Sequence, residues 1–430
     1  MTEQSLSSRI VALDLIVSVL KRRRPLDEAL EGHDGFSALE PRDRAFTRNL
    51  SATTLRRLGQ IDDLIAHCLE RPLPRRAIAA RDVLRLGICQ LFFLNIPAHA
   101  AVDTTVSLLD GIDMAAYKKL VNAIMRRLTR EGDRFLAAQD PARLNTPDWL
   151  WQSWCQAYGE KTCREIAEAH LNEPPLDITV VNEAEIWAKT LEATLLPTGS
   201  LRLSSAGNVT QLAGFNEGAW WVQDAAASLP VVLLGAVKDK HVIDLCAAPG
   251  GKTAQLISRG ARVSAVERSA NRLKRLQQNL DRLNMTAQTI CADATKWSAG
   301  ERADAVLLDA PCSATGTIRR HPDIPLLKTP EDVENLSAAQ GRLFEAALKM
   351  VKPGGQLVFC TCSLQPEEGP DQVAKILAAH PSLRRHPVET EEIGGLSELI
   401  TGEGDLRCLP NHLSGLGGMD GFFISRLVCS

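Results

Sequence analysis

Asp244-Leu245-Cys246-Ala247-Ala248-Pro249-Gly250-Gly251-Lys252-Thr253 lies between an apolar run, residues 241–245, and a helix-compatible run, residues 253–258. This order predicts a strand, a tight glycine-rich turn and a helix. Such a turn presents backbone N–H groups to a ligand at the carboxyl end of a parallel strand. The spacing matches neither the dinucleotide fingerprint nor a P-loop, because Cys246 stands where a P-loop has its first glycine. An ordinary glycine-rich turn is the structural alternative.

Four more strands are predicted, at residues 262–267, 286–293, 303–311 and 356–363, and helical runs such as 270–283 and 336–351 separate them. Strands alternating with helices predict a parallel sheet with its site at the carboxyl ends. Glu267, Asp293 and Asp309 fall at three of these ends. An acid at the tip of the second strand is the usual partner of a ribose diol. Together the three acids suit S-adenosylmethionine, which carries a ribose, an adenine amino group and an ammonium.

Two cysteines also follow predicted strands. Cys312 lies in the run 309–313, Asp-Ala-Pro-Cys-Ser, and Cys362 lies in the run 361–363, Thr-Cys-Ser. A buried cysteine is usually an inert core residue. A pair of cysteines at strand ends beside an acid instead favours catalysis, because a thiolate is a nucleophile and a helix N-terminus lowers its pKa.

These three motifs together resemble those of the RNA cytosine-5 methyltransferases, and the resemblance covers residues from about 140 to 430. It implies that Cys362 attacks the base, that Asp309 contacts the base and that Cys312 aids release of the product. Spacing alone is symmetric between the two cysteines. The resemblance also implies a cofactor loop around the methionine part of S-adenosylmethionine, with Glu267 on the ribose, Asp293 on the adenine edge and Asp309 near the ammonium. The loop residues are Cys246, Ala247, Ala248, Pro249, Gly250, Gly251 and Lys252.

Several positions depart from the family pattern or allow another interpretation. An acid-Asn-acid run usually follows Thr-Cys-Ser, but this chain has Pro-Glu-Glu-Gly at 366–369, which weakens any role for that run. Cys360 would face the same side of an ideal strand as Cys362, so it is a rival thiol, although we expect it in the core. For Arg272 we expect an exposed helix face. Residues 315–323 correspond to an active-site loop in the family, and His321 could instead cap a turn.

Residues 7–131 show helical periodicity almost throughout, for example Ile10, Leu13, Val17 and Leu20 in the run 9–22. Prolines at 25, 41, 72, 74 and 97 separate the helices. The pattern predicts an all-α bundle of six or seven helices, and it resembles the NusB-type RNA-binding domain. Arginine clusters favour phosphate contacts, although cations in last helical turns also stabilise helix dipoles.

With this N-terminal region, the whole chain resembles the bacterial branch of the family that acts on 16S rRNA. We therefore expect a NusB-like helical domain over 1–140, a small α+β RNA-binding subdomain over 145–225, and a Rossmann-like class I methyltransferase domain over 226–430. Residues 132–146 are expected to form a linker. Trp149, Trp151 and Trp154 favour packing between domains over base stacking. A glycine-rich turn at 415–420 predicts a last hairpin at a sheet edge.

Composition excludes several classes of protein. The 430 residues are 45% hydrophobic, which argues against global disorder. The N-terminus lacks a signal-peptide core, and no run of 18 apolar residues predicts a membrane span. Eleven cysteines without zinc-like spacing predict no metal site and fit a reduced cytoplasm. Net charge is −3, but residues 1–145 hold 22 basic against 18 acidic residues, a modest asymmetry that does not by itself indicate nucleic-acid binding.

The sequence therefore predicts an enzyme that methylates carbon 5 of a cytosine in 16S rRNA and works as a monomer without an obligate protein partner. One alternative is an RNA-binding or ribosome-assembly protein with a non-catalytic methyltransferase domain, against which the intact Cys312, Cys362 and Asp309 argue. Another is methylation of an exocyclic nitrogen, which needs no thiols.

Overall fold

The computed structural model describes residues 3–204 and 207–429. Within this range the chain folds into two compact units. The helical unit runs to Asn172 and also includes Ile318–Lys328. The catalytic unit comprises Glu173–Thr317 and the chain from Thr329 onward. The second unit is therefore interrupted by a short piece of the first.

The helical unit confirms the predicted all-α bundle. Its buried core is built from the apolar stripes of the long helices, with Leu15, Leu50, Leu64, Leu84 and Leu128 fully or almost fully buried. Its helices are α1 (Glu3–Arg22), α2 (Leu26–Glu31), α3 (Asp34–Ser37), α4 (Pro41–Arg56), α5 (Leu58–Cys68), α6 (Ile78–Phe92), α7 (Ala98–Leu108), α8 (Lys118–Ala138), α9 (Pro141–Leu144), α10 (Asp148–Tyr158), α11 (Glu160–His170) and α16 (Ile324–Leu327).

The linker predicted at 132–146 is wrong. Helix α8 continues to Ala138, and α9 begins at Pro141. The helix continues because Phe135 and Leu136 pack against the apolar core of the bundle, which a solvated linker could not do. Tertiary burial thus extends the helix past the polar residues that suggested a loop.

Helices α10 and α11 also belong to the helical unit, so its end differs from the boundary expected near residue 140. Trp154 is fully buried and lies 5.4 Å from the His170 ring, centroid to centroid. Arg57 of the bundle donates to the carbonyl of Leu171 over 2.9 Å. Trp154 therefore serves packing, as the sequence favoured, but it packs inside one unit.

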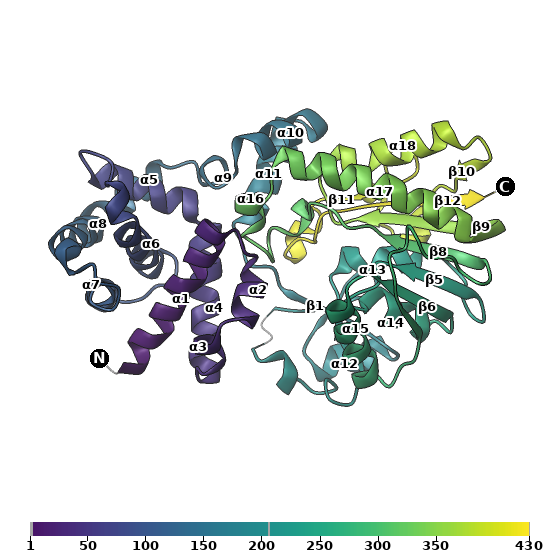
Figure 1. Cartoon of the computed structure of the whole chain (residues 1–430), viewed down its shortest axis with the longest axis horizontal. Helices are drawn as coiled ribbons and strands as arrows, with labels where there is room; N and C mark the ends of the chain where they lie inside the picture. Colours follow the sequence, from purple (N-terminus) through teal and green to yellow (C-terminus); the bar gives the residue numbers. More distant parts are fainter. Residues whose placement is uncertain (1–2, 205–206, 430) are drawn as a thin grey trace. The chain divides into compact units, whose positions relative to one another are not determined.

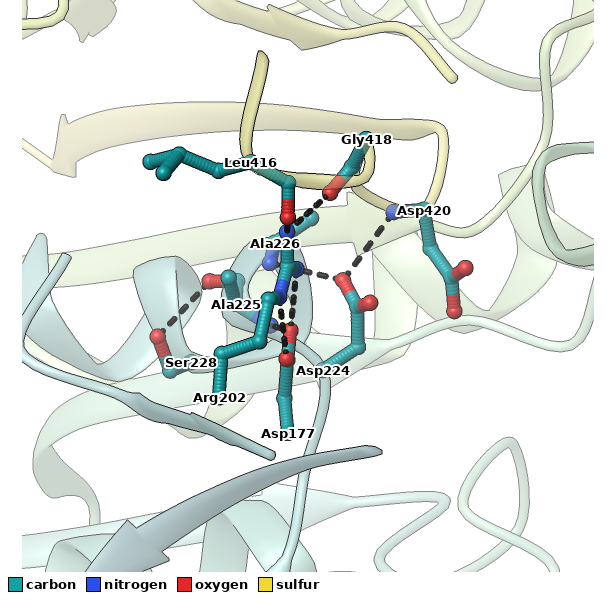
Figure 2. A network of polar contacts seen from close by, with 9 residues as sticks. All are labelled: Asp177, Arg202, Asp224, Ala225, Ala226, Ser228, Leu416, Gly418 and Asp420. Carbon is teal, nitrogen blue, oxygen red and sulfur yellow. Dashed lines mark hydrogen bonds and ion pairs between the residues drawn. The ribbon is translucent and has the colours of Figure 1, made fainter. Parts of the chain in front are cut away.

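A small antiparallel sheet opens the catalytic unit, with strand order β2-β3-β1-β4. Its elements are β1 (Leu176–Val180), α12 (Ala184–Thr190), β2 (Thr194–Leu195), β3 (Leu201–Leu203) and β4 (Trp220–Val222). A buried ion pair joins it to the rest of the unit. Arg202 on β3 binds Asp177 on β1 over 2.7 Å and donates to the carbonyls of Leu416 and Gly418 near the C-terminus (Figure 2).

The large sheet is mixed, with strand order β10-β12-β9-β8-β5-β6-β7, and β11 pairs with β12. Strands β5 to β9 are parallel, and β12 runs antiparallel to β9. Its strands are β5 (His241–Leu245), β6 (Arg262–Glu267), β7 (Gln288–Cys291), β8 (Ala303–Asp309), β9 (Val351–Thr361), β10 (Leu383–Arg385), β11 (Leu406–Cys408) and β12 (Phe422–Cys429).

Helices cover both faces of this sheet. Helices α13 (Ala225–Val232), α14 (Gly251–Ser258) and α15 (Ala270–Arg282) lie on one face, and α17 (Pro330–Met350) and α18 (Pro370–Ala379) lie on the other (Figure 1). Successive strand residues point to opposite faces of the sheet. Val242 therefore lies in the core beneath α13, α14 and α15, and Ile243 lies in the core beneath α17 and α18. This double covering explains the nearly continuous apolar strands and confirms the predicted Rossmann-like architecture.

The final strand corrects one expectation. β12 is not an edge hairpin, because it pairs with β9 on one side and with β10 and β11 on the other. Its residues from Phe422 to Leu427 are buried, as an interior strand requires. Among the helices of the described residues, none is long and apolar enough to cross a membrane.

Candidate active site

The glycine-rich turn joins β5 to α14 as predicted. Cys246 and Gly250 both have positive φ, at 60° and 104°. The backbone angle of Gly250 favours glycine, and a Cβ there would lie 3.1 Å from the Leu276 side chain, which would have to shift slightly. The result is a tight backbone curve at the carboxyl end of β5.

Asp244, the last but one residue of β5, is fully buried below this turn. One carboxyl oxygen accepts the Thr253 hydroxyl over 2.6 Å, and the other has no hydrogen-bond partner. Burial raises the pKa of Asp244 to about 7, and the Thr253 hydrogen bond opposes this shift in part. We did not predict a role for this residue, although its place at the start of the motif was visible.

Glu267 ends β6 as predicted and is only 4% exposed. Its Oε1 accepts the Ser269 N–H over 2.9 Å. Its Oε2 lies 3.2 Å from the Arg272 guanidinium but makes no hydrogen bond. Arg272 also donates to the Ala248 carbonyl over 2.6 Å, so it links the glycine-rich turn to Glu267. Arg272 is exposed on α15, as expected, and it also makes these contacts with the turn and with Glu267.

The polar atoms around the turn suit a ligand with hydroxyl and ammonium groups. Two buried carboxyl oxygens, on Asp244 and Glu267, have no hydrogen-bond partner, and a buried acceptor without a donor is costly. Asp293 accepts the Thr295 N–H and hydroxyl over 3.0 and 2.7 Å, and these bonds lower its pKa. Acids thus lie at or near the carboxyl ends of β5, β6 and β7, an arrangement that suits S-adenosylmethionine.

Asp309 and Lys252 connect this region to the cysteines. Lys252 donates to Asp309 over 2.8 Å, and the thiol of Cys360 donates to the other Asp309 oxygen over 3.4 Å. Burial opposes the charge on Lys252, but Asp309 and the nearby thiols outweigh burial and raise its pKa. Cys360 is fully buried, and burial raises its pKa well above the usual range. Cys360 is thus a buried core thiol.

Cys312 and Cys362 meet although they are fifty residues apart in the chain. Their sulfur atoms lie 3.4 Å apart, and both side chains are partly exposed. The parallel pairing of β8 with β9 brings the ends of the two strands together. The hydrogen bond to Cys362, followed by burial, raises the pKa of Cys312 well above its usual value. Cys312 therefore holds its proton beside the Cys362 sulfur.

Glu368 ties the two cysteine loops together. It is fully buried and accepts the N–H of Ser313 over 2.8 Å as well as its hydroxyl. It also accepts a hydrogen bond from Ser363, and Gln340 donates to it over 3.2 Å. Burial raises the pKa of Glu368 and these four hydrogen bonds lower it, leaving a net rise. Sequence reasoning discounted this acid because its neighbours depart from the family run.

The predicted active-site loop is divided. Thr315 and Gly316 stay in the catalytic unit, where the Gly316 N–H donates to the Cys362 carbonyl over 2.9 Å. Residues from Ile318 to Lys328 belong to the helical unit, and His321 lies 3.2 Å from Asp27 there. His321 thus faces a carboxylate of α2, and its carbonyl accepts the N–H of Ile324 over 3.1 Å.

Comparisons with known proteins show which family this chain belongs to. The model of the 16S rRNA methyltransferase RsmB/F family matches residues 231–428, and that of the NusB family matches residues 6–130. The chain is 34% identical to ribosomal RNA small subunit methyltransferase B of Vibrio vulnificus, over 98% of this chain and 99% of that protein. It is 36% identical to the protein of the same name from Vibrio cholerae, over 87% and 90% of the two chains.

Solved structures show the same fold. The crystal structure of PH0851 superposes with a TM-score of 0.76 at 22% identity and covers 99% of both chains. A methyltransferase homologue from Pyrococcus horikoshii superposes with a TM-score of 0.54 at 26% identity, over 65% of this chain and 94% of that one. Together these matches confirm the predicted S-adenosylmethionine-dependent methyltransferase with a NusB-like domain, and the chain belongs to the 16S rRNA methyltransferase RsmB/F family.

Proposed function

We propose that this enzyme methylates carbon 5 of a cytosine in 16S rRNA, with Cys362 forming a covalent bond to carbon 6 and Cys312 assisting its release. The 3.4 Å approach of the two sulfurs beside Asp309 and Lys252 supports this proposal most strongly. Carbon 5 of cytosine is a poor nucleophile by itself. Thiolate addition at carbon 6 makes an enamine whose carbon 5 can attack an electrophilic methyl group.

The surroundings of Cys362 favour its attack on the base. Lys252 interacts electrostatically with Cys362, and its ammonium also binds Asp309 over 2.8 Å. The protonated Cys312 can donate a hydrogen bond to the same sulfur. S-adenosylmethionine, held by the glycine-rich turn and Glu267, supplies the methyl group as a sulfonium.

Asp309 contacts the base during this attack. Its two oxygens accept from Lys252 and Cys360, and each carboxylate oxygen keeps a second acceptor position. The exocyclic amine of cytosine donates to this position. A fixed carboxylate there stabilises the positive charge that develops on the amine when carbon 5 of the enamine attacks the methyl group.

Cys312 acts in the second half of the reaction. The main cause of its raised pKa is the interaction with Cys362, and adduct formation converts Cys362 into an uncharged thioether. The pKa of Cys312 therefore falls once the adduct exists, and its proton passes to solvent. The resulting thiolate takes the carbon 5 proton, the electrons of that C–H bond re-form the ring double bond, and the Cys362 thiolate leaves.

The helical unit provides RNA affinity in this proposal. Arg22, Arg126 and Arg130 are exposed, and the match to the NusB family covers most of the bundle. Phosphate contacts release counterions, so the logarithm of the affinity for rRNA should fall linearly with the logarithm of the salt concentration. An affinity that does not depend on salt would contradict this role.

Adduct trapping tests the two cysteine roles. Cys362→Ala should form no protein–RNA adduct and no 5-methylcytosine. Cys312→Ala should attack and methylate but release poorly, so an adduct should survive denaturing electrophoresis. Cys360→Ser is the matched thiol control, because it keeps a donor for Asp309 and should behave like the wild type. An adduct in Cys362→Ala would reverse the assignment, and bisulfite sequencing of the rRNA identifies the methylated cytosine.

A further inference from the structure

Residues Ile318–Lys328 leave the catalytic unit and fold as part of the helical unit. The chain passes from one unit to the other between Thr317 and Ile318 and returns between Lys328 and Thr329. Leu326 and Leu327 pack against the apolar core of the helical bundle. This segment, called the docked segment below, begins only six residues after Cys312 in the sequence.

Arg23 holds the end of the docked segment. Its guanidinium donates to the carbonyl of Leu326 over 3.4 Å and to that of Leu327. Arg23 follows α1 in a left-handed backbone conformation, with φ of 54°. Glycine or asparagine usually fills such a position after a helix, because other residues are strained there.

Asp323 and Arg56 hold the middle and the start of the docked segment. Asp323 is buried and accepts the N–H of Leu26 over 2.9 Å. Helix α2 has no side-chain cap of its own, so a residue of the docked segment satisfies its first N–H. At the start of the segment, Arg56 donates to the carbonyl of Arg319 over 2.7 Å.

The chain is equally fixed on the catalytic side of both crossings. The carbonyl of Gly316 accepts the N–H of Gly421 over 2.8 Å, and a Cβ on Gly316 would lie 2.1 Å from the Gly421 carbonyl oxygen. On the other side, Thr329 forms a capping box with Asp332 at the start of α17. Only Thr317 separates Gly316 from the docked segment. One residue spans at most about 3.6 Å, so it absorbs little movement.

We propose that Arg23, Arg56 and Asp323 are positioning residues for the methyl transfer. They fix the docked segment to the helical unit, and this anchoring limits the movement of the loop from Cys312 to Thr317. The helical unit thus has a second task besides RNA binding, because it holds one end of a catalytic loop. The catalytic part of this inference rests on the proposed role of Cys312.

The test uses the full chain with Arg23→Ala/Arg56→Ala. Arg24→Ala/Arg42→Ala is the matched control, because it removes the same charge from exposed arginines, one shortly after α1 and one in α4. Hydrogen exchange measured by mass spectrometry should become faster in residues 312–317 as well as in the docked segment. The kcat should fall about tenfold to a hundredfold, as a displacement of about 1 Å predicts, with unchanged KM for rRNA. Arg23→Lys/Arg56→Lys should restore part of kcat, because lysine still donates to a carbonyl.

Two outcomes would overturn the proposal. Faster exchange confined to the docked segment, with unchanged kcat, would show that the loop does not depend on the anchor. A raised KM with unchanged kcat would show that the arginines bind RNA instead. The exchange measurement needs no chemistry, so it remains decisive even if the wild type forms no cytosine adduct and the proposed function fails.

Discussion

Replacing Glu368 with alanine should uncouple the two cysteine loops. The carboxylate is fully buried, and its removal deprives the Ser313 N–H of its acceptor. The Ser313 hydroxyl can still pair with Ser363 over 3.1 Å, and Gln340 keeps its bond to the Pro311 carbonyl over 3.0 Å. One buried donor is therefore left unpaired, which costs about 1–3 kcal/mol. The cavity left by the side chain adds a further loss, so we expect a total near 2–4 kcal/mol.

The effect on catalysis should exceed the effect on binding. Ser313 and Ser363 directly follow Cys312 and Cys362, so loosening both serines moves both sulfurs. A displacement of about 1 Å typically lowers a rate about a hundredfold. Cofactor affinity should not change, because Glu267 and the glycine-rich turn make no contact with Glu368 in the described hydrogen bonds. Glu368→Gln keeps an acceptor for the Ser313 N–H and should retain most of the activity.

The assay combines urea unfolding, calorimetry with S-adenosylmethionine and adduct formation in a single turnover. Glu367→Ala is the control, because this neighbouring acid is exposed. The reasoning is refuted if Glu368→Ala forms adduct at the wild-type rate while its stability falls as expected. In that case the carboxylate would support the fold without positioning the thiols.

Three further predictions concern buried acids and their partners. The pKa of Asp244 is about 7 in the folded protein, against an ordinary value of 3.8. The protonated carboxyl therefore contributes to the free energy of unfolding below pH 4, and this contribution is lost as pH rises through 7. The loss is at most about 4 kcal/mol. Asp244→Asn should therefore stabilise the protein at pH 8 relative to the wild type but not at pH 4, and a pH-independent difference in urea unfolding would contradict this. Glu267→Ala should weaken S-adenosylmethionine binding by about 1–3 kcal/mol, and replacing the exposed Glu334 with alanine should leave it unchanged. If calorimetry gives the Glu267→Ala variant the affinity of the wild type, Glu267 does not bind the ribose. Arg202→Ala leaves the buried Asp177 without its cation and should lower the free energy of unfolding by about 3–5 kcal/mol. The double variant Asp177→Asn/Arg202→Met should recover much of this stability. Equal loss of stability in both variants would rule out the ion pair as the cause.

Local sequence was sufficient where the signal depends on neighbouring residues. The glycine-rich turn, the acid that ends β6 and the two cysteine corners each lie at the end of a strand whose apolar run is visible in the chain. Parallel strands place their carboxyl ends at one edge of a sheet, so the sequence could predict that Cys312 and Cys362 lie on the same side. The helical stripes of the first 131 residues likewise identified the bundle, because a buried helix face repeats along the chain.

Only the tertiary structure decided how distant segments meet. The buried Glu368, the link from Arg272 to Ala248 and the Cys360–Asp309 bond each join residues more than twenty positions apart, and no local pattern encodes them. The helix through 132–138 and the interior place of β12 depend on burial against other elements. The transfer of Ile318–Lys328 to the helical unit depends on Arg23, Asp323 and Arg56 in the same way. Periodicity reports which side of an element is buried, but the partner that buries it is chosen by long-range packing.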